Sequence, residues 1–126
     1  MKLLYRVSTF LILALGLLHI SMTPLIFRGL TANALWFASG GILIIFLSFF
    51  NFILMADTGG QRVVRMLTHT ANLLGLVFGC VMLIIESRRA RPGPLAWFVL
   101  VLLVFETVAA FRHASRVKTE VGSNAS

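Results

Sequence analysis

The chain has 126 residues, of which 59% are hydrophobic and only 12% charged, and its formal net charge is +7. A soluble domain carries about twice that share of charged residues, so the composition excludes an ordinary water-soluble globular protein. The basic residues stand at the ends of apolar segments, where they suit lipid headgroups, and this placement argues against nucleic-acid binding. The one cysteine, Cys80, excludes a disulfide within the chain.

Four predominantly apolar segments make up most of the sequence. They are Leu3–Met22, Ala34–Ala56, Val63–Ile85 and Leu95–Phe111. Each is about long enough to cross the ~30 Å hydrocarbon core of a bilayer as an α-helix, and we take the first as a retained span rather than a cleaved signal peptide. We therefore predict an all-α integral membrane protein, a four-helix up-down bundle with short loops, whose single domain covers residues 1–112.

The segments between the spans carry turn and polar signals. Pro24 predicts the end of the first helix, because proline lacks the backbone N–H that a helix interior needs. Residues 57–60 predict a tight turn, and residues 87–94 predict a rigid basic loop in which Pro94 opens the fourth helix. The polar composition of residues 113–126 predicts a disordered C-terminal tail.

The distribution of basic residues predicts the orientation. The side that holds both termini carries seven of them, Lys2, Arg6, Arg62, Arg65, Arg112, Arg116 and Lys118. The opposite side carries four, Arg28, Arg88, Arg89 and Arg91. Because cytoplasmic loops are enriched in Lys and Arg, we expect both termini in the cytoplasm, and we expect the membrane to be a bacterial inner (plasma) membrane.

Polar and small side chains recur at three- and four-residue steps along every span, so each helix has one polar face. Lipid offers no hydrogen bonds, so these faces should point toward one another. Reflecting the residue numbers through the turns brings six polar residues together in the inner half of the bundle. They are Glu106, Asn72, His69, Asn51, Ser48 and Thr9. We predict that these six form a ligand- or proton-binding cluster.

Glu106 is the most informative member of this predicted cluster. An ionised, unpaired carboxylate at that depth costs ~2–3 kcal/mol or more, so it should be protonated, hydrated or paired. One interpretation is structural, with a neutral or His69-paired Glu106 fixing the helix packing. A second is functional, with Glu106 titrating or binding a ligand in a small cavity, and a third shifts the span boundary so that Glu106 lies near the headgroups.

The sequence gives little sign of enzymatic chemistry. It contains no glycine-rich phosphate loop, no Cys-x-x-Cys and no His-Glu-x-x-His motif. His69 and His113 fall at one level on adjacent helices, where histidines can hold a haem or a metal, but His113 lies toward the wet interface. We expect no catalytic residue, no metal and no cofactor.

These patterns favour a small multi-pass membrane protein that is a non-enzymatic accessory or scaffold subunit. The alternative is a small proton-coupled transporter or exporter that uses the intramembrane Glu106. As partners we expect the lipid bilayer and no nucleic acid, and the sequence leaves open a homodimer or a larger membrane complex. The pair Gly75 and Gly79 predicts close approach of another helix.

Overall fold

The structure is a computed structural model that describes residues 2–56, 61–89 and 93–123, with the backbone alone at residues 89 and 116–123. These residues form four helices and no strand, and the fold is 93% helical. The helices are α1 (Lys2–Ile26), α2 (Ala32–Ala56), α3 (Arg62–Arg89) and α4 (Pro94–Ser123). All four are long and apolar enough to cross a membrane, which agrees with the predicted spans.

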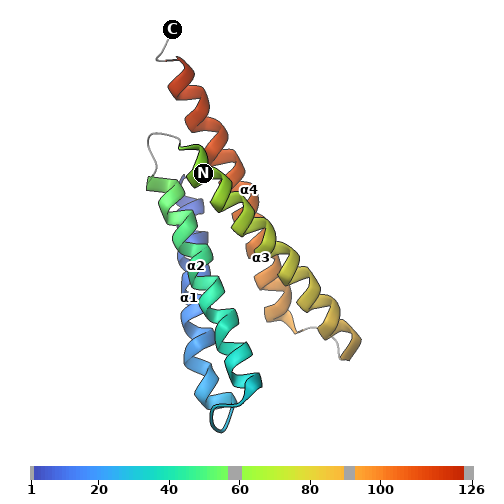
Figure 1. The fold of residues 1–126 in the computed structure, drawn as a ribbon. Coiled ribbons are helices and arrows are strands. Elements are labelled where there is room, and N and C mark those ends of the chain that lie inside the picture. Colours follow the sequence, from blue (N-terminus) through green and yellow to red (C-terminus); the bar gives the residue numbers. More distant parts are fainter. Residues whose placement is uncertain (1, 57–60, 90–92, 124–126) are drawn as a thin grey trace.

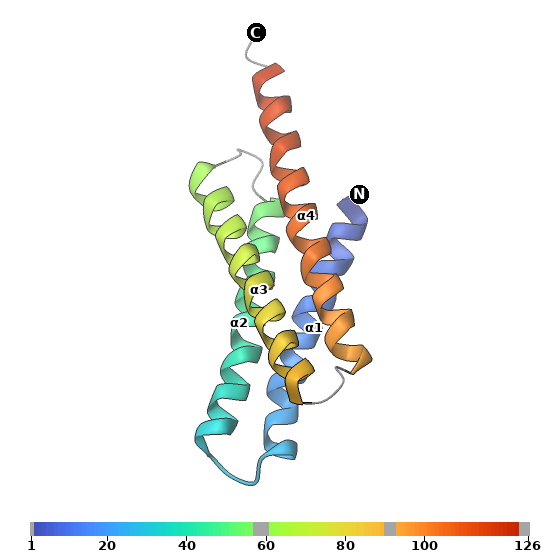
Figure 2. The ribbon, with the colours of Figure 1, turned by 90° about the vertical axis from the view of Figure 1, so that its right-hand side faces the viewer.

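Successive helices run antiparallel, so the start of α1 and the end of α4 lie at the same end of the molecule (Figure 1). We call this the terminal end. The helices form two hairpins, α1 with α2 and α3 with α4, and contacts of α2 with α3 and of α1 with α4 join them. The hairpins lie close at the terminal end and diverge toward the other end (Figure 1), where the α1–α2 hairpin reaches further (Figure 2).

The α1–α2 hairpin is closely packed because two glycines face each other. A Cβ atom built on Gly16 would lie 3.0 Å from the carbonyl oxygen of Gly41, and one on Gly41 would lie 3.0 Å from the carbonyl oxygen of Gly16. A backbone oxygen cannot move aside as a flexible side chain can, so only glycine allows this approach.

Gly75 and Gly79 of α3 receive side chains instead of another backbone. A Cβ on Gly75 would lie 3.1 Å from a methyl of Leu47 on α2, and one on Gly79 would lie 2.9 Å from a methyl of Leu103 on α4. The predicted close approach at these glycines is thus made by leucines of the same chain.

The apolar side chains are divided between a small core and a large outer surface. The core has two clusters of buried residues, Tyr5, Leu54, Ala109 and Ala110 in one and Ile12, Leu47, Leu102 and Leu103 in the other. Large apolar side chains on the outward faces of all four helices are exposed. Exposed apolar surface of this extent is typical of helices surrounded by lipid, because a water-soluble monomer shows much smaller patches.

The first helix continues through Pro24 to Ile26, so the predicted end at Pro24 is wrong. The turn beyond the proline keeps its own bond, from the Phe27 N–H to the Thr23 carbonyl oxygen at 3.0 Å. The Thr23 hydroxyl also donates to the His19 carbonyl oxygen at 3.2 Å. A proline therefore costs this helix one bond without ending it, as transmembrane helices commonly tolerate.

The C-terminal segment also differs from its prediction. We predicted disorder from residue 113, but α4 continues to Ser123. After Pro94 the sequence has no proline and no glycine before residue 122, and helical hydrogen bonds are local, so a polar stretch can extend the helix. Pro94 opens α4 as predicted. The loop predicted at 87–94 is wrong at its start, because α3 continues to Arg89. Residues 90–92 of that loop and the turn predicted at 57–60 lie outside the described residues.

Candidate functional site

A buried network of polar side chains connects all four helices. Its members, which we call the polar network, are Tyr5, Ser8 and Thr9 of α1, Asn51 of α2, Asn72 of α3 and Glu106 of α4. None of the six is more than 3% exposed. The members on α1, α2 and α3 lie in the halves of those helices nearer the terminal end, where the two hairpins lie close (Figure 1).

Glu106 joins α4 to α1. The Ser8 hydroxyl is hydrogen-bonded to its Oε2 atom and the Thr9 hydroxyl to its Oε1 atom. In the described ranges of the chain no ion pair to Glu106 is present, and the side chain is 0% exposed. The carboxyl group is thus held by neutral hydroxyls rather than by a cation.

The two hydroxyls can satisfy a neutral carboxylic acid completely. Each also lies 2.9 Å from the Tyr5 carbonyl oxygen, although a hydroxyl has only one proton to donate. If Glu106 donates its acid proton to one hydroxyl, that hydroxyl donates to the Tyr5 carbonyl. The other hydroxyl then donates to the remaining carboxyl oxygen. Every donor has an acceptor in this arrangement, and no cation is needed.

Asn51 joins α1, α2 and α3 through one side-chain amide. Its Nδ2 donates to Asn72 Oδ1 at 3.0 Å, and Asn72 Nδ2 donates back to Asn51 Oδ1 at 2.9 Å. The Tyr5 hydroxyl donates to the same Asn51 oxygen at 2.6 Å, and Asn51 Nδ2 also donates to the Leu47 carbonyl oxygen at 2.8 Å. The Asn51 amide therefore uses both its donors and both its acceptor sites.

The predicted cluster is brought together in part. Thr9 contacts Glu106, and Asn51 pairs with Asn72, with Tyr5 linking the two pairs. Two further residues were placed in the cluster by their spacing, Ser48 and His69. The structure gives them other contacts.

Ser48 is buried, but its hydroxyl donates to the Ile44 carbonyl oxygen of its own helix at 3.1 Å. The His69 ring stacks on Phe111 with centroids 4.0 Å apart and an interplanar angle of 4°. Its Nδ1 atom is buried and has no hydrogen-bond partner. His69 therefore packs as an aromatic ring, and the partners of Glu106 lie on α1 instead.

The predicted cluster lacked three contributors on the inward faces, Tyr5, Ser8 and Thr68. Ser8, which binds Glu106, lies three residues after Tyr5 and so shares its side of the helix. Thr68 is 0% exposed and donates across helices to the Phe50 carbonyl oxygen at 3.1 Å. Thr68 lies four residues before Asn72, so the same helical spacing could have found it.

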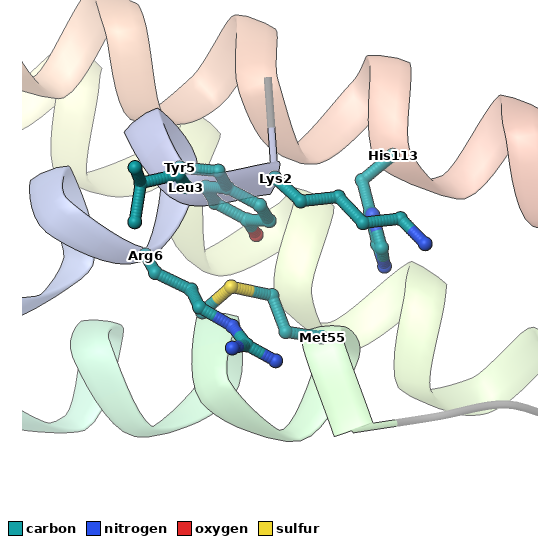
Figure 3. Close-up of a pocket in the computed structure, with 6 residues that line it drawn as sticks. All are labelled: Lys2, Leu3, Tyr5, Arg6, Met55 and His113. Atoms are coloured by element: carbon teal, nitrogen blue, oxygen red, sulfur yellow. The ribbon is translucent and has the colours of Figure 1, made fainter.

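A pocket of about 240 Å³ lies at the terminal end of the bundle. Its lining residues are Lys2, Leu3, Tyr5, Arg6, Met55 and His113, from α1, α2 and α4 (Figure 3). We call it the rim pocket. The ring centroids of Tyr5 and His113 are 5.8 Å apart. Tyr5 belongs both to the rim pocket and to the polar network.

Within the described part of the chain, no group of three or more His, Cys, Asp or Glu side chains is arranged so that it could hold a metal ion.

Comparison of the chain with protein-family models, with curated proteins and with solved structures gives no significant match.

Proposed function

We propose that the chain is an integral membrane protein whose four helices span a bacterial inner membrane, with both termini in the cytoplasm. The apolar outer surface and the inward polar network support insertion, because lipid favours this distribution of side chains. Trp36 and Trp97 are exposed near the ends of their helices, where indole rings favour the membrane interface. The excess of basic residues on the terminal end supports the orientation.

Within that membrane we propose a non-enzymatic accessory or scaffold subunit. The observation that carries this proposal is the environment of Glu106, which is fully buried and hydrogen-bonded at both oxygens by hydroxyls of another helix. A group that exchanges protons or ligands needs a route to water. A group that fixes two helices needs burial and complete hydrogen bonding, and Glu106 has both.

The polar network suits a scaffold because it fixes the positions of the helices along one another. Glu106 ties α4 to α1, and Asn51 ties α2 to both α1 and α3. Sliding one helix past another would leave a buried polar group without a partner, which costs about 1–3 kcal/mol. The resulting rigid bundle would present a constant outer surface to a partner protein in the membrane.

The substitution Glu106→Gln tests the scaffold proposal. The carboxamide oxygen can accept from one hydroxyl while its NH₂ group donates to the other, so the packing should survive. We expect normal abundance, normal assembly with membrane partners and an unchanged cellular phenotype when the variant replaces the wild type in the cell. Loss of the phenotype at normal abundance would contradict a purely structural Glu106.

The second candidate function is a small proton-coupled transporter or exporter. Supporting it, Ser8 and Thr9 bond both Glu106 and the backbone carbonyl of Tyr5, which lines the rim pocket. Tyr5 thus contacts both the rim pocket and the two hydroxyls that hold Glu106.

A proton-flux measurement separates the two functions. In proteoliposomes with an imposed pH gradient, followed with a pH-sensitive dye, a transporter predicts faster dissipation by the wild type than by Glu106→Gln. Equal rates would favour the scaffold.

A further inference from the structure

The rim pocket combines two cationic side chains with an aromatic wall. Lys2 extends toward His113, and Arg6 extends past Met55 (Figure 3). The Tyr5 hydroxyl is engaged with Asn51 at 2.6 Å, so its ring forms a wall of the pocket while its polar atom stays inside the bundle. None of the described residues that line the pocket is acidic. The pocket therefore favours an anion.

The apolar residues of the pocket indicate what kind of molecule carries that anion. Leu3 is 73% exposed at the outside of α1, and Met55 lines the opposite side of the pocket on α2. A small hydrophilic anion gains nothing from such side chains, whereas a lipid places its headgroup on the cations and its glycerol and upper acyl carbons on the apolar residues.

We infer that the rim pocket binds a phosphate group, carried by the headgroup of an anionic phospholipid. Arg6 supplies a planar fork that suits two phosphate oxygens, and Lys2 supplies a compact charge. Basic pockets between helices on the cytoplasmic side of a membrane suit such headgroups. The lipid as source rests on the proposed membrane insertion, whereas the anion site itself depends neither on that insertion nor on the role of Glu106.

Native mass spectrometry of the full-length protein in a mild detergent tests this inference. The probes are phosphatidylglycerol, phosphatidylcholine with the same acyl chains, and inorganic phosphate. We expect phosphatidylglycerol to bind roughly fivefold or more tightly than phosphatidylcholine. Arg6→Gln should weaken phosphatidylglycerol binding by roughly five- to tenfold, because one charge facing the headgroup is lost.

Arg62→Gln is the matched control. Arg62 begins α3 at the same end of the bundle, is exposed and does not line the pocket, so the variant makes the same charge change outside the site. It should change phosphatidylglycerol binding less than twofold. Equal losses in Arg6→Gln and Arg62→Gln would overturn the inference, because they would reflect general surface charge. Helicity and elution volume confirm that each variant is folded. If Arg6→Gln does not fold, Lys2→Gln replaces it as the test variant, because Lys2 also lines the pocket.

The third probe identifies the source of the phosphate group. One outcome is that inorganic phosphate binds in an Arg6-dependent manner while phosphatidylglycerol binds no more tightly than phosphatidylcholine. This outcome would keep the anion site and overturn the lipid as the source of the phosphate group. Failure of all three probes to bind would overturn the site itself. Loss of the cellular phenotype in Glu106→Gln would contradict the scaffold proposal without affecting any of these outcomes.

Discussion

At the scale of single residues, Asn51 and Asn72 donate hydrogen bonds to each other, but Asn51 has more hydrogen-bond partners than Asn72. Asn51 also accepts from the Tyr5 hydroxyl and donates to the Leu47 carbonyl oxygen, so it keeps two partners when Asn72 is removed. The two side-chain hydrogen bonds that the structure describes for Asn72 are both made with Asn51. Removing Asn51 would therefore strand two buried groups, the Asn72 amide and the Tyr5 hydroxyl.

This asymmetry predicts unequal effects on stability. Asn51→Ala should lower the free energy of unfolding by about 1–3 kcal/mol more than Asn72→Ala, since a stranded buried polar group loses its solvation without compensation. Reversible unfolding in mixed micelles, titrated with a denaturing detergent, measures both values. Thr107→Val is the control, because the Thr107 hydroxyl donates to Leu103 of its own helix. Equal destabilisation by the two asparagine variants would contradict the central position of Asn51.

Helical spacing predicted part of the polar network and could not predict the rest. It placed Thr9, Asn51, Asn72 and Glu106 on inward faces, and these residues do meet. Ser48 lies on the same kind of face, yet its hydroxyl turns back to its own helix. The hydrogen-bond partner of a hydroxyl depends on its rotamer and on small differences in the distance between helices. The spacing of residues along the sequence gives no information about either.

At the scale of helices, hydropathy located the apolar part of each element but not its ends. A helix needs only local backbone hydrogen bonds, so α4 continues beyond its apolar part to Ser123. A proline removes one such bond, so α1 passes through Pro24 when its last turn is otherwise bonded. Gly16 and Gly41 lie on the predicted polar faces of their helices, but the sequence does not show that they face each other. That contact is visible only in the packed α1–α2 hairpin.

Neighbouring glycines of α2 test this packing. Alanine in place of glycine within a helix normally stabilises it by about 1 kcal/mol. Gly40→Ala should follow that rule, because its Cβ would make an ordinary contact with His19 at 3.5 Å. Gly41→Ala should instead destabilise the bundle by about 1–3 kcal/mol, since its Cβ would meet the Gly16 backbone and an Ile20 side-chain carbon at 2.7 Å. The same unfolding titration compares the two variants, and equal behaviour would contradict the close α1–α2 contact.

At the scale of the whole molecule, the side chains are distributed in the opposite way to those of a water-soluble bundle. The most completely buried side chains are largely polar, and the exposed ones are largely aliphatic and aromatic. Two hairpins that meet through the polar network account for the buried polar residues. In the proposed membrane location the exposed apolar residues would face lipid, because lipid cannot satisfy an amide or carboxyl and another helix can. The helical periodicity of polar and small residues predicted this overall arrangement, because the polar residues of every helix have to lie on its inward face.

Spin-label accessibility along α4 tests this arrangement most directly. In a Cys80→Ala background reconstituted into lipid, single labelled cysteines replace the residues on both sides of Glu106, and collision with oxygen dissolved in the bilayer is measured. The inward positions are Leu102, Leu103, Ala109 and Ala110, and the outward positions are Val101, Val104, Phe105, Val108 and Phe111. We predict low accessibility at the inward positions and high accessibility at the outward ones, with the period of a helix. Uniform accessibility, or maxima at the inward positions, would contradict a bundle in which Glu106 faces the other helices.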